Sequence, residues 1–135
     1  MPVPSQSDVG ATLRPRLRAA LLTAMKSRDR LTTGVLRATL AAIENAEAVD
    51  TTSADRALAI EQTPLVGAAE AERRALTETH VEQIVRAEAA ARQAAARDYD
   101  RAGKPERAEM LRTEARVLLT HLAGHAGHNS QEHPS

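Results

Sequence analysis

The 135-residue chain contains no cysteine, tryptophan or phenylalanine, and Tyr99 is its single aromatic residue. Without cysteine it can form neither a disulfide nor a thiolate nucleophile. Without a set of aromatic side chains it lacks the stacking platforms that bind single-stranded nucleic acid. No apolar run approaches the roughly 20 residues that span a bilayer, and the start lacks the pattern of a signal peptide. We therefore expect a cytoplasmic protein that makes no contact with a membrane.

The apolar residues that are present favour helices. Leucine and the many alanines are strong helix formers, whereas valine and isoleucine are too few for a sheet-rich domain. The composition predicts an all-α fold, and the pattern of apolar stripes predicts an irregular four-helix bundle made of two helical hairpins. We expect one domain over residues 12–122, a flexible tail over 1–11, and a disordered histidine-containing tail over 123–135.

The first hairpin is predicted from two stripes at helical spacing. One helix should cover residues 12–27, and the next should begin at about Asp29 or Leu31 and end at Val49. The expected buried residues are Leu13, Leu17, Leu21 and Ala24 in the first helix, and Val35, Leu36, Thr39, Leu40, Ala42 and Ile43 in the second. Residues from about 50 to 76 are poorly periodic and contain Pro64 and Gly67. They are typical of a long surface loop, either a tolerated insertion or a functional segment.

The second hairpin is predicted by Gly103-Lys104-Pro105, because glycine ends a helix and proline suits the first turn of the next. A helix should begin at Thr77 or Thr79, which can cap it, and a last helix should run from Pro105 to about His121. The expected buried stripes are Val81, Ile84, Val85, Ala91, Ala95 and Ala102, followed by Ala108, Leu111, Ala115, Leu118 and Leu122. Pairs at i,i+4 spacing, Glu82–Arg86 and Glu88–Arg92, should support the helix that precedes the corner.

Charge is unevenly distributed although the formal net charge is zero. Residues 1–40 contain seven basic and two acidic side chains, and residues 41–80 contain three and eight. The basic residues of the first hairpin that could contact phosphates are Arg14, Arg18, Lys26, Arg28, Arg30 and Arg37. Two uses stay open: this surface binds nucleic acid, or it pairs with the acidic middle of the chain, as Arg37 could with Glu44.

The order of these elements resembles the GatB/YqeY family of small helical proteins. The residues that carry the resemblance are Ala24-Met25-Lys26, Val35-Leu36-Arg37, Leu76-Thr77-Glu78, Arg92, Tyr99, Ala102-Gly103-Lys104, Glu114 and the end at Leu118–Leu122. The family shares a helical domain with the tail of one subunit of the aspartyl/glutamyl-tRNA amidotransferase, and that tail is linked to tRNA. The resemblance therefore implies tRNA, an amidotransferase or another tRNA enzyme as the partner. It also implies the family's label of carbon–nitrogen ligase activity with glutamine as amido-N-donor.

The residues themselves show no catalytic constellation. No GxSxG, Walker-type or HExxH pattern is present, and neither Ser27 nor Ser53 has an activating base near it in the sequence. We expect no catalytic residue and no cofactor. The function that we predict is a non-catalytic accessory module that binds tRNA backbone through the basic corner of the first hairpin, with a protein–protein adaptor as the alternative.

Two further groups have a functional and a structural interpretation. Arg92 and Tyr99 lie seven residues apart on one helical face, where they could form a recognition pair. Alternatively Tyr99 closes the corner beside Gly103, and Glu114 of the last helix holds Arg92. His121, His125 and His128 have the look of a metal site, but Gly124 and Gly127 favour a solvated tail, so we expect no metal.

Overall fold

The computed structural model describes the backbone of residues 13–60 and 66–131, and the side chains of residues 13–49 and 77–125. The predicted tail over 1–11 lies outside the described residues. Four helices make up this part of the chain: α2 (Leu13–Lys26), α3 (Arg30–Ile60), α4 (Val66–Arg101) and α5 (Pro105–Gln131). No strand occurs in it. The predicted all-α fold of two helical hairpins is confirmed.

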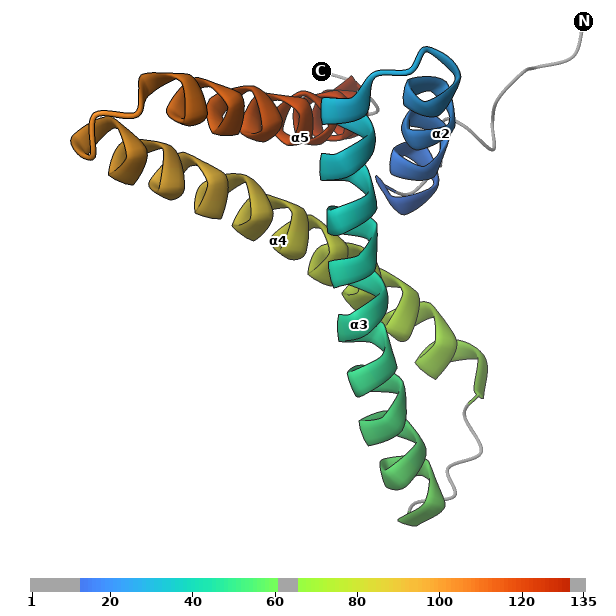
Figure 1. Cartoon of the computed structure of the whole chain (residues 1–135). Helices are drawn as coiled ribbons and strands as arrows, with labels where there is room; N and C mark the ends of the chain where they lie inside the picture. The colour runs from blue at the N-terminus through green and yellow to red at the C-terminus, as the bar shows by residue number, and fades with distance from the viewer. Residues whose placement is uncertain (1–12, 61–65, 132–135) are drawn as a thin grey trace, which may run out of the picture.

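The two hairpins meet in a crossed arrangement. Figure 1 shows α2 beside the first part of α3, and α4 joined to α5 at a corner far from α2. Because α3 is more than twice as long as α2, its second half runs on beyond the end of α2. The result is an irregular bundle rather than four parallel helices of equal length.

The main hydrophobic core lies where the hairpins cross. It contains leucines from α2, the apolar stripe of α3, the valines of α4 and the second half of α5, namely Leu13, Leu17, Val35, Leu36, Leu40, Ile43, Val81, Val85, Ala89, Ala115, Leu118 and Leu122. A second, smaller cluster of Ala96, Ala108 and Leu111 lies nearer the corner between α4 and α5, with Ala95 and Tyr99 packed against it. The stripes predicted for α2, α3 and α5 are thus largely confirmed.

The predicted stripe of α4 is wrong in part. Ala91 and Ala102 are exposed, whereas Ala89 and Ala96 are buried. The spacing of Val81, Val85 and Ala89 continues through residue 92 to Ala96. With alanine at so many positions, composition does not distinguish one helical register from the next. In this register Arg92 lies on the face of α4 that is turned toward the core.

The long loop predicted over residues 50–76 is wrong. Helix α3 continues to Ile60 and α4 begins at Val66, so only residues 61–65, which include Pro64, lie outside the description. Hydrophobic periodicity reports the burial of one face rather than helix formation. The sequence over residues 68–76 is rich in alanine, glutamate and arginine, which have enough helix propensity to form the start of α4 without such a stripe. Gly67 lies in the first turn of α4, where the free-energy cost of a glycine in a helix is small.

The disordered tail predicted over residues 123–135 is wrong for residues 123–131, because α5 extends to Gln131, and residues 132–135 lie outside the described residues. Gly124 lies inside the helix, although a glycine there costs up to about 1 kcal/mol relative to alanine. Leu122 and His125, on either side of it, are both buried. Tertiary packing of these two side chains offsets the low propensity of the glycine.

Candidate nucleic-acid interface

The corner between α2 and α3 is a tight turn that ends one helix and starts the next. The backbone N–H of Asp29 donates to the carbonyl oxygen of Ala24 at 2.9 Å, and that of Arg28 donates to the carbonyl oxygen of Met25 at 3.2 Å. This pair of bonds is the Schellman motif, which requires a left-handed residue at the position of Arg28. Arg28 has a φ of 59°, and it is the one non-glycine residue with positive φ in the described part of the chain.

Asp29 starts α3 as its N-cap. Its Oδ1 accepts a hydrogen bond from the backbone N–H of Thr32 at 3.1 Å, and its Oδ2 accepts one from the Thr32 hydroxyl at 2.7 Å. These two bonds, led by that of the hydroxyl, lower the pKa of the Asp29 carboxyl below its ordinary value, because both stabilise the charged form. The cap satisfies a backbone donor that the first turn would otherwise leave open.

Four of the six predicted basic residues lie at or near this corner. Lys26, Arg28 and Arg30 are exposed on the turn itself. Arg37, about two turns beyond Arg30 on α3, is exposed and donates through Nη2 to the sulfur of Met25 at 3.8 Å. Within the part of the chain that the structure describes, no ion pair involves these four side chains. With Asp29 as the acidic residue among them, the corner carries a net positive charge.

The other two predicted basic residues are used differently. Arg14 forms an ion pair with Glu47 of α3, and its side chain is only 20% exposed. Arg18 lies 4.0 Å from Glu44 between Nη2 and Oε1. For these two arginines the interpretation as partners of the acidic middle of the chain is confirmed. The suggested pair of Arg37 with Glu44 is wrong, because Glu44 faces α2 and is approached by Arg18.

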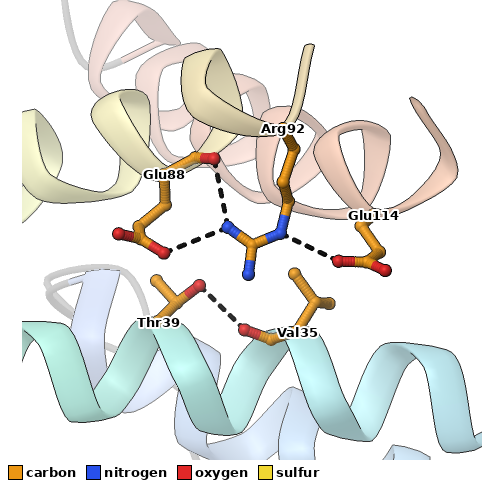
Figure 2. A network of polar contacts seen from close by, with 5 residues as sticks. All are labelled: Val35, Thr39, Glu88, Arg92 and Glu114. Carbon is orange, nitrogen blue, oxygen red and sulfur yellow. Dashed lines mark hydrogen bonds and ion pairs between the residues drawn. The ribbon is translucent and has the colours of Figure 1, made fainter. Parts of the chain in front are cut away.

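Arg92 is the centre of a polar network between α4 and α5 (Figure 2). Its Nε donates to Oε1 of Glu114 at 3.0 Å, as the sequence predicted, and its Nη1 donates to both the carbonyl oxygen and Oε1 of Glu88, at 3.1 and 3.0 Å. The guanidinium points toward α3, where the fully buried Thr39 donates its hydroxyl to the Val35 carbonyl at 2.8 Å. The Arg92 side chain is 14% exposed. This network joins α4 to α5 within the second hairpin, and it faces α3 rather than an open surface.

The corner between α4 and α5 has the same turn as the first one, with glycine in the left-handed position. Gly103 has a φ of 75°, the N–H of Lys104 donates to the carbonyl oxygen of Tyr99 at 2.8 Å, and that of Gly103 donates to the carbonyl oxygen of Asp100 at 3.1 Å. Tyr99 packs against the second cluster, and the guanidinium of Arg107 lies 5.8 Å from the centre of its ring. The arrangement favours the structural interpretation of Tyr99.

Two contacts that involve α5 histidines could not be anticipated from the sequence. His125 donates from Nε2 to Oε1 of Glu82 at 2.8 Å and is buried, so Glu82 bonds across the hairpin. Burial, together with the positive charge of Arg16, lowers the pKa of His121. Arg16 also packs beside Gly124. These partners lie 43 or more residues apart in sequence, so no local pattern could have revealed them.

A shallow, open groove of about 340 Å³ lies between the first turn of α3 and α5. Its lining residues are Thr32, Thr113, Arg116, Val117, Thr120 and His121. Among the described residues no group of three or more histidines, cysteines or carboxylates is placed to hold a metal ion. In the same part of the chain no helix combines the length and apolar character needed to cross a bilayer.

Comparison with models of known protein families finds no match for this chain. Neither the search of curated proteins nor the search of solved structures finds a significant match.

Proposed function

We propose that this chain is an accessory module that binds the phosphate backbone of tRNA through the α2–α3 corner. The observation that carries the proposal is Arg28, a cationic residue in a left-handed turn position where glycine would cost less. Strained positions of this kind concentrate at functional sites. Lys26 and Arg30 flank it, and all three side chains are exposed.

The choice of tRNA rests on the resemblance to the GatB/YqeY family, whose helical domain is linked to tRNA. The chemistry of the corner agrees with backbone recognition, since arginine and lysine contact phosphate oxygens without reading bases. The chain offers one tyrosine, Tyr99, and it packs in the second cluster at the other corner. Recognition of a folded RNA by shape and charge fits this surface better than stacking of single-stranded bases.

The test is a titration of the purified chain with fluorescently labelled tRNA, followed by anisotropy at several salt concentrations. The triple variant Arg28→Ala, Arg30→Ala and Arg37→Ala should bind more weakly. Its slope of log K against log salt should be smaller by about 2 to 3, because each lost phosphate contact removes nearly one unit. The matched control replaces Arg97, Arg101 and Arg116, which are exposed arginines of α4 and α5, and should bind like the unmodified chain.

Asp29→Asn provides a change in the opposite direction. Asparagine caps a helix about as well as aspartate, so the turn is kept while one negative charge is removed from the corner. Binding to tRNA should become tighter, and the gain should shrink at high salt. Equal loss of affinity in both triple variants, or no binding at low salt, contradicts the proposed site.

A further inference from the structure

The outward side of the α2–α3 hairpin carries an apolar patch that no described element covers. Leu22 and Met25 of α2 are 59% and 44% exposed. On α3 the small residues Gly34, Ala38 and Ala41 are also exposed and lie at helical spacing. A Cβ built on Gly34 would meet no atom within 4 Å. We call these five residues the outer patch.

The contacts between α2 and α3 fix the position of the patch. Arg14 meets Glu47, Arg18 meets Glu44, and Arg37 meets Met25. The two helices are therefore antiparallel, and this register places Leu22 level with Leu40 and next to Ala41. The outer patch therefore combines large exposed side chains on α2 with small exposed ones on α3.

The rim of the outer patch is basic. Arg18 and Lys26 lie one turn to either side of Leu22 on α2, and Arg30 and Arg37 share the outward side of α3. Two acidic residues lie near these cations: Glu44 on α3, with Arg18 4.0 Å from it, and Asp29 at the turn, where it caps α3. An apolar centre with cationic edges is complementary to an amphipathic helix that has apolar residues on one face and glutamate or aspartate along its edges.

We propose that the outer patch is the docking site for an acidic amphipathic helix of a partner protein. Leucine or isoleucine side chains of that helix cover Leu22 and Met25, and methionine adapts to such ligands because its side chain is flexible and polarisable. Acidic side chains of the helix reach Arg18 and Arg37. This is the helix-in-groove mode of recognition. The site goes beyond the proposed tRNA contact, since its centre is apolar and faces outward from the hairpin rather than lying at the turn.

The experiment uses the two methionines of the described residues as matched probes. Met25 and Met110 are 44% and 46% exposed, but Met110 is on α5. The full chain, labelled with ¹³C in the methionine methyl groups, is titrated with a synthetic helical peptide that has leucines on one face and glutamates elsewhere. The Met25 signal should shift and saturate while that of Met110 stays in place. A peptide with the same leucines and lysines in place of the glutamates should leave both signals unchanged.

Substitutions without charge change separate this site from the RNA contact. Leu22→Asn should weaken peptide binding at least tenfold, whereas Leu119→Asn, at an α5 leucine that is 39% exposed, should not. Neither change should alter the salt slope of tRNA binding. Equal shifts of Met25 and Met110, or equal binding of both peptides, would overturn the proposal. So would a Met25 signal that responds to tRNA and not to the acidic peptide, and in that case the patch is part of the RNA surface.

Discussion

Arg28 and Gly103 occupy the same place in two turns with the same hydrogen-bond pattern, at φ values of 59° and 75°. The left-handed region costs a residue with a Cβ about 1–2 kcal/mol, and for glycine this cost is almost absent. The second corner therefore has the lower conformational cost. The first corner gives up some stability to keep a guanidinium at the turn, which is the arrangement that our functional proposal uses.

Introducing glycine at the first corner and removing it from the second should change the stability of the fold in opposite directions. Arg28→Gly should stabilise the fold by about 1 kcal/mol, and Gly103→Ala should destabilise it by about 1–2 kcal/mol. Urea unfolding followed by circular dichroism measures both. Arg28→Gly should also weaken tRNA binding, so that stability and affinity change in opposite senses. A destabilised Arg28→Gly variant would show that the side chain makes a contact that outweighs the turn.

His121 should make stability depend on pH. Burial and the charge of Arg16 lower its pKa in the folded chain below the ordinary 6.5. The unfolded chain then takes up a proton at a higher pH than the folded chain does. The contribution of His121 is present in full above 6.5 and is lost as the pH falls through and below that value.

The measurement is the free energy of unfolding of the unmodified chain and of His121→Gln from about pH 8 to about pH 5. The free energy of unfolding of the unmodified chain should fall relative to that of the variant as the pH falls, because the variant lacks this titrating group. Arg16→Met should reduce the acid sensitivity of the unmodified His121, because it removes the repulsive charge. Parallel curves for the unmodified chain and His121→Gln would rule out this residue as the source.

At the scale of single helices, Arg92 lies between the main core and the second cluster. Its neighbours Ala89 and Ala96 belong to different clusters, as do Ala115 and Leu111 on the facing helix. A charged network thus interrupts what would otherwise be one continuous apolar seam of the α4–α5 hairpin. Ion pairs of this kind fix register, since a slip by one turn would leave a partly buried charge without its partner.

A double-mutant cycle should reveal that role. Arg92→Met leaves two partly buried carboxylates unpaired and should destabilise the fold by about 1–3 kcal/mol. Glu114→Gln alone should cost less, and the double variant should be more stable than the sum of the single effects predicts. Thermal unfolding measures the stability of each variant. Arg101→Met is the control, because the Arg101 side chain is 76% exposed. Strict additivity would mean that Arg92 and Glu114 contribute independently.

Two helix glycines offer a second test of element stability. Gly34→Ala on α3 adds a Cβ into open space, and it should stabilise the chain by up to about 1 kcal/mol through helix propensity. At Gly124 the new Cβ would lie 3.1 Å from Nη2 of Arg16, the end of a flexible side chain. Gly124→Ala should therefore also stabilise, by a smaller amount. The melting temperatures of the two variants show which substitution stabilises the chain more. A destabilised Gly124→Ala variant would show that Arg16 cannot move.

The helices themselves were the part of the structure that sequence patterns could best predict. Both corners, the four helix positions and most of the buried stripes follow from local propensity and spacing. The lengths of α3, α4 and α5 did not follow, because hydrophobic periodicity was the main signal for a helix and the sequence of these helix ends is not periodic. His125 is an example. Its burial against Glu82 depends on tertiary packing, and the neighbouring Gly124 predicted the end of the helix instead.

At the scale of the whole molecule, the two hairpins meet mainly through one core at their crossing. Each hairpin is built from neighbours in sequence, which favours rapid local assembly. The candidate site could be predicted only as a set of basic residues. Which of them remain exposed depends on acidic partners across the hairpin. Arg14 pairs with Glu47 and is only 20% exposed, whereas Arg18, 4.0 Å from Glu44, stays 54% exposed.

Tyr99 has a practical consequence for experiments on this protein. As the single aromatic residue it is the only intrinsic fluorophore, and it sits in the second cluster rather than in the main core. Its emission therefore reports on the tip of one hairpin, whereas far-ultraviolet ellipticity averages over every helix. Recorded together, the two signals distinguish opening of the tip from loss of the whole fold without any added label.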